Sequence, residues 1–197
     1  MKVAFGIKAH SGWAALVVLG KRGTEPQVVE RSRIELVESD DAGWAKQPYH
    51  AAEHLKPPAA RDLVERGIAT AHRLAVREIR AAERRARDAG HDVAACGVLT
   101  VAPMPAWTVD EILAVHFRMH KAEGVLFRDA LVRAAGECGL RCVEVLEKQM
   151  NERAERVLAT SAANLQQTLA RLGKTVGPPW GRDQKDASLA ALIALRR

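Results

Sequence analysis

Three spaced polar residues that could bind a metal lie within a predicted helix, residues 108–137. His116, His120 and Glu123 follow one another at i, i+4 and i+7, which places them on one helix face. Imidazole and carboxylate groups on one face can ligate a metal ion, or can hydrogen-bond to a loop or a substrate. The alternative is a structural role, either under a neighbouring loop or in a subunit contact. Apolar residues share this face, so we expect all three groups to be buried and to need partners.

Two carboxylates lie three residues apart at the start of the last predicted helix, residues 183–195. Asp183 and Asp186 share one side of that helix at this spacing. Acids in a first helical turn are favoured by the helix dipole without any ligand.

A row of arginines lies on the polar side of the predicted helix 62–89. The row spans about 21 Å at about 1.5 Å per residue, long enough to meet several phosphates of a nucleic acid. Glu78 and Glu83 are near enough to pair with it, so a solvated helix face is the alternative. The row consists of Arg73, Arg77, Arg80, Arg84 and Arg87.

Composition favours a single domain, 1–197, that carries a net charge of +6 and is 48% hydrophobic. The positive charge favours a polyanionic partner such as nucleic acid, although mildly basic proteins without one are common. Three cysteines, with no second pair of metal ligands, indicate reduced thiols. We see no signal peptide and no apolar segment near the roughly 20 residues that span a bilayer, so the sequence predicts a cytoplasmic protein without a membrane partner.

The elements that must position these groups begin with a strand hairpin around His10-Ser11-Gly12, followed by a third strand over 27–37. Residues 38–61 show no clear periodicity and are predicted to form a long loop, either functional or a surface connector. Beyond it, helices over 62–89, 108–137, 151–172 and 183–195 alternate with strands over 93–101 and 140–146. The predicted fold is α/β, an antiparallel meander extended by parallel strands with helices on both faces.

This order of elements is similar to the ribonuclease H-like fold, and within it to the Holliday-junction-resolvase type. Two motifs support the resemblance. Gly6-Ile7-Lys8-Ala9-His10-Ser11 resembles the first-strand motif Gly-Ile-Asp-Pro-Gly-Ser of that family. Asp183-Gln184-Lys185-Asp186-Ala187, followed by small and apolar residues, resembles its last-helix motif.

The resemblance implies a site in which carboxylates from the first strand, a middle strand and the last helix hold Mg²⁺ or Mn²⁺. Asp183 and Asp186 match the last-helix pair. Lys8 stands where the first-strand Asp would be, and the strand 93–101 contains no acid. An ammonium group would repel a divalent cation at close range. Three outcomes remain open: Lys8 pairs with an acid and leaves an inactive site, Lys8 binds a substrate phosphate, or the site has been rebuilt around His10 and the residues His116, His120 and Glu123.

The residues and the family resemblance together leave three candidate functions. The first is a nucleic-acid-associated, nuclease-type protein with a divergent or degenerate metal site, drawn from Lys8, His10, Glu123, Asp183 and Asp186. The second is a non-catalytic assembly or regulatory protein, possible as a homo-oligomer, whose polar helix faces are contact surfaces. A third candidate is a metal-dependent hydrolase of small molecules that uses His116, His120 and Glu123. No phosphate-binding glycine loop, dinucleotide fingerprint or nucleophile-elbow serine occurs in the sequence.

Overall fold

A five-stranded mixed sheet lies at the centre of the computed structural model, which describes residues 1–196. The strand order is β3-β2-β1-β4-β5, so the first strand of the chain is the middle strand of the sheet. β1 to β3 form the predicted antiparallel meander, and β4 and β5 extend it in parallel with β1. The strands are β1 (Lys2–His10), β2 (Trp13–Arg22), β3 (Glu25–Glu35), β4 (Asp92–Thr100) and β5 (Cys142–Leu146).

The hairpin between β1 and β2 is tight because Ser11 and Gly12 alone connect the strands. Gly12 has a φ of 85°, a conformation that glycine adopts without strain. This turn pairs His10 directly with Trp13, and the pairing continues to Val3 opposite Gly20. Successive side chains of β1 point to opposite faces of the sheet, and each face is covered by a layer of helices.

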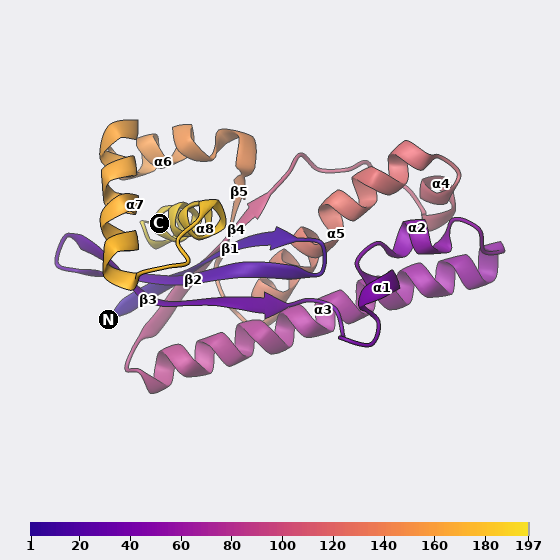
Figure 1. Cartoon of the computed structure of the whole chain (residues 1–197), viewed down its shortest axis with the longest axis horizontal. Coiled ribbons are helices and arrows are strands. Elements are labelled where there is room, and N and C mark those ends of the chain that lie inside the picture. Colours follow the sequence, from indigo (N-terminus) through magenta and orange to yellow (C-terminus); the bar gives the residue numbers. More distant parts are fainter. Residues whose placement is uncertain (197) are drawn as a thin grey trace.

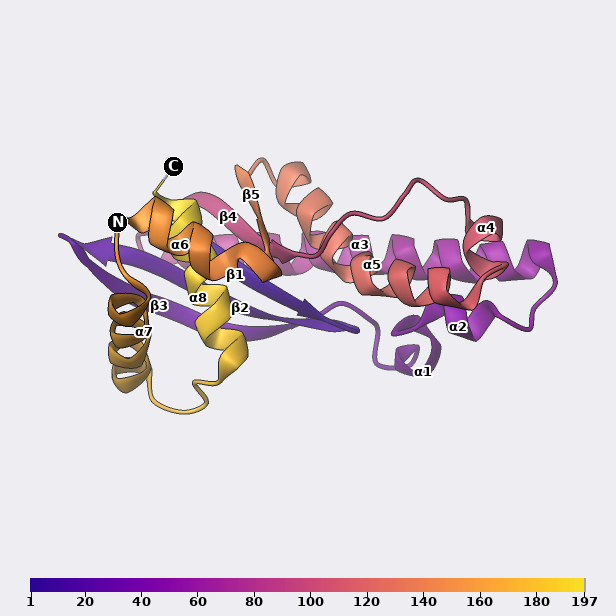
Figure 2. The same cartoon turned by 90° about the horizontal axis from the view of Figure 1, so that it is seen from above.

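Helices cover both faces of the sheet, as predicted (Figures 1 and 2). On one face, α3 (Pro57–Asp88) and α5 (His116–Glu137) pack on the side of β1 that bears Phe5 and Ile7. On the other face, α8 (Arg182–Leu195) lies over Ala4, with α6 (Met150–Leu158) and α7 (Ala162–Val176) beside it. The sheet thus separates two hydrophobic cores.

The predicted loop over 38–61 is wrong in part, because this segment contains two short helices and the start of α3. These are α1 (Ala42–Ala45) and α2 (Pro48–Ala52). Proline begins both α2 and α3, since its fixed φ and missing N–H suit a first helical position. Both short helices lie beyond the end of the sheet, and α2 lies beside the first turns of α5 and the helix α4 (Val109–Leu113) (Figures 1 and 2).

Two predicted helices are interrupted. The capping box of Thr108 and Glu111 forms as predicted, but it begins only α4, because Val115 is extended at φ −140° and ψ 110° and precedes α5. The helix predicted over 151–172 is divided by Ala159, which adopts a left-handed conformation before Ser161 caps α7. A short 3₁₀ turn (Glu147–Gln149) precedes α6. Among residues 1–196, none of the helices has the length and apolar character needed to cross a lipid bilayer.

Candidate functional site

Close packing of α8 against β1 and β4 brings the first strand and the last helix together. A β-carbon added to Gly6 would lie 1.8 Å from the carbonyl oxygen of Ala187, and one added to Gly97 would lie 2.3 Å from that of Ala190. Only glycine permits this approach. The first turns of α8 therefore lie over the face of β1 that bears Lys8 and His10.

The loop that leads into α8 is also fixed, because Arg31 on β3 binds its backbone. The guanidinium group donates hydrogen bonds to the carbonyl oxygens of Val176 at 3.2 Å, Gly177 at 2.8 Å and Pro178 at 2.6 Å, and also to that of Pro179. The start of α8 is thus anchored to the sheet from two sides, by glycine packing and by this arginine.

An ion pair between Lys8 and Asp186 is the main feature of the junction between β1 and α8. Lys8 Nζ lies 2.5 Å from Asp186 Oδ2 and 3.5 Å from Asp183 Oδ1. The side chains of Lys8 and Asp186 are only 9% and 15% exposed, so water screens the pair weakly. Arg182 adds a second cation, with Nε 3.5 Å from Asp186 Oδ2. The structure therefore brings Lys8 together with both acids of the last helix.

His10 lies at the edge of this ion pair. Its Nε2 atom is 3.1 Å from Asp183 Oδ2, although within residues 1–196 it makes no hydrogen bond of good angular geometry. The ring stacks on Trp13, with centroids 4.3 Å apart and planes at 11°. The guanidinium carbon of Arg33 lies 4.1 Å from the centroid of the same tryptophan. We call His10, Trp13 and Arg33 the stacked triplet.

Trp13 and Arg33 were missing from the residues that the sequence singled out. The position of Trp13 could have been predicted from the two-residue turn, because this turn places Trp13 opposite His10 on the same face of the sheet. The position of Arg33 depends on the register between β2 and β3, which shifts between Val18 and Leu19. A bulge of this kind cannot be located from alternation alone.

The junction does not fit a divalent cation held between Asp183 and Asp186. The ammonium group of Lys8 already occupies the space next to both carboxylates, and it would repel a second positive charge there. Of the three outcomes that the sequence left open for Lys8, the structure contains the ion pair with an acid. In this arrangement the acids neutralise Lys8 and Arg182 and fix the start of α8 on the sheet.

Glu123 does not take part in this junction, which corrects the expectation that it joins Lys8 and the aspartates. It lies on α5, in the layer on the opposite face of the sheet from α8. Its carboxylate accepts hydrogen bonds from the backbone N–H of His50, at 3.1 Å, and from Nδ1 of the same residue, at 2.7 Å. Burial, together with this carboxylate, raises the pKa of nearby Tyr49 to about 12, so its hydroxyl stays protonated.

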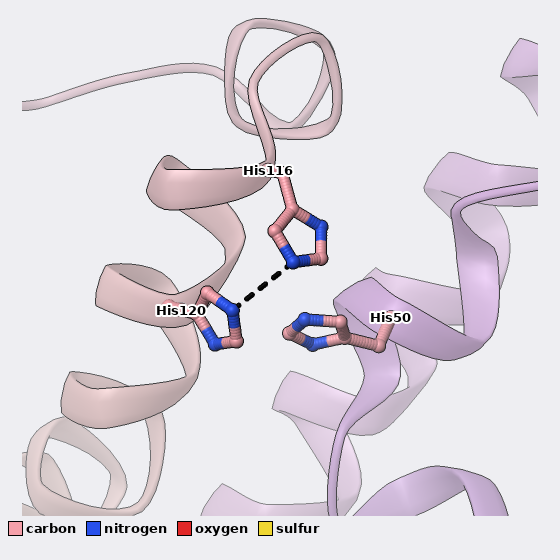
Figure 3. A group of neighbouring side chains, drawn as sticks. All are labelled: His50, His116 and His120. Atoms are coloured by element: carbon pink, nitrogen blue, oxygen red, sulfur yellow. Dashed lines mark hydrogen bonds between the residues drawn. The ribbon is translucent and has the colours of Figure 1, made fainter.

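The prediction that His116 and His120 are buried is wrong, because both side chains are exposed. The first turns of α5 extend past the end of the sheet (Figure 1), where Met119 on the apolar side of the helix is still buried but His116 and His120 are not covered. Instead the two rings face His50 from α2, as Figure 3 shows. His116 Nε2 and His120 Nε2 are 3.1 Å apart, and the ligating atoms of all three residues lie within 4.8 Å of one another. We call these three residues the histidine cluster.

The arginine row lies on the outer side of α3, on the opposite face of the sheet from Lys8. The predicted pairing with glutamates is confirmed for Arg77 with Glu78, at 3.0 Å, and for Arg87 with Glu83, at 2.5 Å. Arg73 and Arg80 pair with Glu38 and Glu137. Within residues 1–196, Arg84 is the one member of the row for which no ion pair is found.

Comparison with known proteins supports the fold. The structure is similar to that of T. thermophilus RuvC in complex with a Holliday junction substrate, with a TM-score of 0.51 and 12% sequence identity over 98% of this chain and 92% of that one. It is also similar to a second Thermus thermophilus RuvC structure, with a TM-score of 0.50 and 12% identity over 97% and 91% of the two chains. No protein-family model and no curated protein sequence matches the chain.

The protein therefore has an α/β fold of the ribonuclease H-like class, as the order of its elements predicted. At 12% identity the likeness shows the fold alone. The residues that bear on function lie at the junction of β1 and α8.

Proposed function

We propose that this chain is a nucleic-acid-associated protein that binds branched or single-stranded DNA without cutting it at the junction of β1 and α8. The observation that carries the proposal is the contact of 2.5 Å between Lys8 Nζ and Asp186 Oδ2. Cleavage by a ribonuclease H-like nuclease needs divalent metal ions at that place, as the family resemblance implies. Here an internal cation replaces them.

Support for nucleic acid as the partner comes from the surface beside the ion pair. In the stacked triplet the imidazole ring of His10 and the guanidinium group of Arg33 lie on the indole ring of Trp13, and such groups can stack on bases and contact phosphates. Arg31, Arg33 and Trp13 also line one shallow groove next to α8. One of the similar structures named above holds a Holliday junction, which makes a four-way junction the first substrate to test.

Binding can be measured by fluorescence anisotropy with a labelled four-way junction, with duplex and single-stranded DNA of the same sequence for comparison. We expect micromolar or tighter binding that weakens as salt rises from 50 to 200 mM, because phosphate contacts release counterions. Trp13→Ala and Arg33→Ala should each weaken it about tenfold, in line with roughly 1–3 kcal/mol for a stacking contact. Arg61→Ala removes an exposed arginine elsewhere and should leave binding unchanged.

Cleavage tests the other half of the proposal. The wild type should leave the junction intact in Mg²⁺ or Mn²⁺, and neither ion should raise its melting temperature. Lys8→Asp places a third carboxylate beside Asp183 and Asp186, so it should melt lower in EDTA and recover with Mg²⁺. Lys8→Met removes the charge without adding a ligand and should show a smaller response. Metal-dependent cleavage by the wild type that Asp186→Asn abolishes would contradict the proposal.

An assembly or regulatory protein is the second candidate, and the pairing of the arginine row favours it. Four of the five arginines have glutamate partners, so this surface is closer to neutral than its sequence suggests. Absence of DNA binding, together with a homo-oligomer in sedimentation velocity experiments, would support this candidate instead.

A further inference from the structure

The histidine cluster lies outside the site of the proposed function, at the end of the molecule where α2 and α5 meet (Figures 1 and 3). His50 comes from α2, in the segment predicted to be a loop, whereas His116 and His120 come from one face of α5. Three imidazole rings from two separate segments meet here, with ring centroids 4.6 to 5.2 Å apart. The folded chain is needed to bring them together.

Carboxylates lie behind two of the three rings and fix which nitrogen is free. His50 Nδ1 is 2.7 Å from Glu123 Oε2, and the Glu123 side chain is only 7% exposed. His116 Nδ1 is 3.3 Å from Glu53 Oε1. A carboxylate accepts a hydrogen bond, so each Nδ1 is the protonated atom and each Nε2 presents a lone pair. In Figure 3 the rings turn toward a common centre between them.

We propose that the histidine cluster binds one divalent transition-metal ion, foremost Zn²⁺, through three imidazole nitrogens. Two nitrogens bound tetrahedrally to Zn²⁺ at about 2.0–2.1 Å stand roughly 3.3 Å apart, close to the 3.1 Å between His116 Nε2 and His120 Nε2. Glu123 is then the carboxylate that orients His50 and not a ligand, unlike the role that the sequence suggested.

The chemistry of the ligands decides the class of metal. Imidazole suits Zn²⁺, Cu²⁺, Ni²⁺ and Co²⁺, whereas Mg²⁺ and Ca²⁺ prefer oxygen. His116 and His120 are exposed, with His116 60% exposed, so solvent can fill the fourth position. Binding would join the α2 segment to α5. This proposal does not depend on the function proposed for the β1 and α8 junction.

Titration of tag-free protein with ZnCl₂ in a calorimeter tests the site. We expect one equivalent to bind with micromolar or tighter affinity, and CoCl₂ to give the visible absorption bands of low-symmetry Co²⁺. His116→Ala and His120→Ala change exposed residues, so both variants should fold while binding at least about tenfold more weakly. His54→Ala removes an exposed histidine near α2 and is the matched control, which should bind like the wild type.

Glu123→Gln tests the carboxylate behind His50. Loss of its charge should weaken Zn²⁺ binding by about 10- to 100-fold, while circular dichroism shows an intact fold. Three outcomes would show that the proposal is wrong. In the first, the wild type binds Zn²⁺ no tighter than the His116→Ala and His120→Ala variants; in the second, His54→Ala weakens binding as much as they do, so that scattered surface histidines hold the metal. In the third, no stoichiometric binding is found.

Discussion

Gly6 lies directly beneath Ala187, so close that a β-carbon on the glycine would stand 1.8 Å from the alanine's carbonyl oxygen. This contact joins the middle strand of the sheet to the last helix. It places the acids of the first turns of α8 over Lys8, two residues further along β1. The ion pair therefore depends on the absence of a side chain at Gly6 as much as on the charges of the residues that form it.

Gly6→Ala should destabilise the fold by about 3 kcal/mol or more, at the upper end of the cost of overpacking, because backbone rather than a flexible side chain occupies the space. Urea unfolding monitored by circular dichroism measures the loss. Gly124→Ala is the matched control, since nothing lies within 4 Å of its added carbon and alanine favours the helix by roughly 0.5–1 kcal/mol. Equal stability of the Gly6→Ala variant and the wild type would show that α8 is not packed as described.

Arg31→Ala should lower the free energy of unfolding by about 1–3 kcal/mol, because it leaves four carbonyl oxygens of the loop before α8 without their charged donor. Arg31→Lys keeps the charge but cannot reach four acceptors at once, so it should recover only part of the loss. Chemical denaturation measures both variants. Full recovery by lysine would mean that charge alone holds the loop.

Cys142 should react slowly with iodoacetamide at pH 8. Burial, and to a lesser extent the negative charge of Glu144, raise the pKa of its thiol to about 11. Its alkylation rate should rise about tenfold per pH unit from 7 to 10, without the plateau that an ordinary thiol reaches near 9. The unfolded thiol loses its proton at lower pH, so stability falls as pH rises from about 9 toward 11. Mass spectrometry of the alkylated peptides gives the rates, and a plateau near pH 9 would refute the shift.

Ala159→Gly should stabilise the protein by up to about 1 kcal/mol. The alanine is left-handed at φ 50° and ψ 52°, which costs a non-glycine residue about 1–2 kcal/mol, and the greater freedom of glycine in the unfolded chain offsets part of the gain. Ala170→Gly, at an exposed position in the interior of α7, should instead destabilise by about 1 kcal/mol. Thermal melts of both variants decide the sign. If both variants lose stability, Ala159 is not strained.

Much of the fold could be predicted because its evidence is local. Apolar runs, turn residues and, for β5, alternation located the five strands, and the resemblance of the element order and of two motifs to the ribonuclease H-like class predicted the fold. The interruptions at Val115 and Ala159 were not predicted, since neither residue ends a helix by its type and the surrounding apolar spacing continues through both.

The site was harder to predict because its parts depend on contacts that are distant in sequence. Lys8, Asp183 and Asp186 were found through a family motif. The predicted place of Glu123 beside Lys8 is wrong, and its partner His50, 73 residues away in a segment without periodicity, could not be inferred from spacing. Spacing on α5 identified the correct face but could not show that this face extends past the sheet.

The position of β3 bears on how copies of this chain could associate. β3 is an outer strand of the sheet, and its charged side chains include Glu30, which pairs with Arg85 at 2.7 Å, and Arg33, which pairs with Glu35. Ionic groups along a border disfavour the addition of another strand, because each would lose water on contact. We therefore expect any homo-oligomer to associate through helical surfaces. We also expect the charged edge to suppress the fibrous aggregation to which open sheet edges are prone.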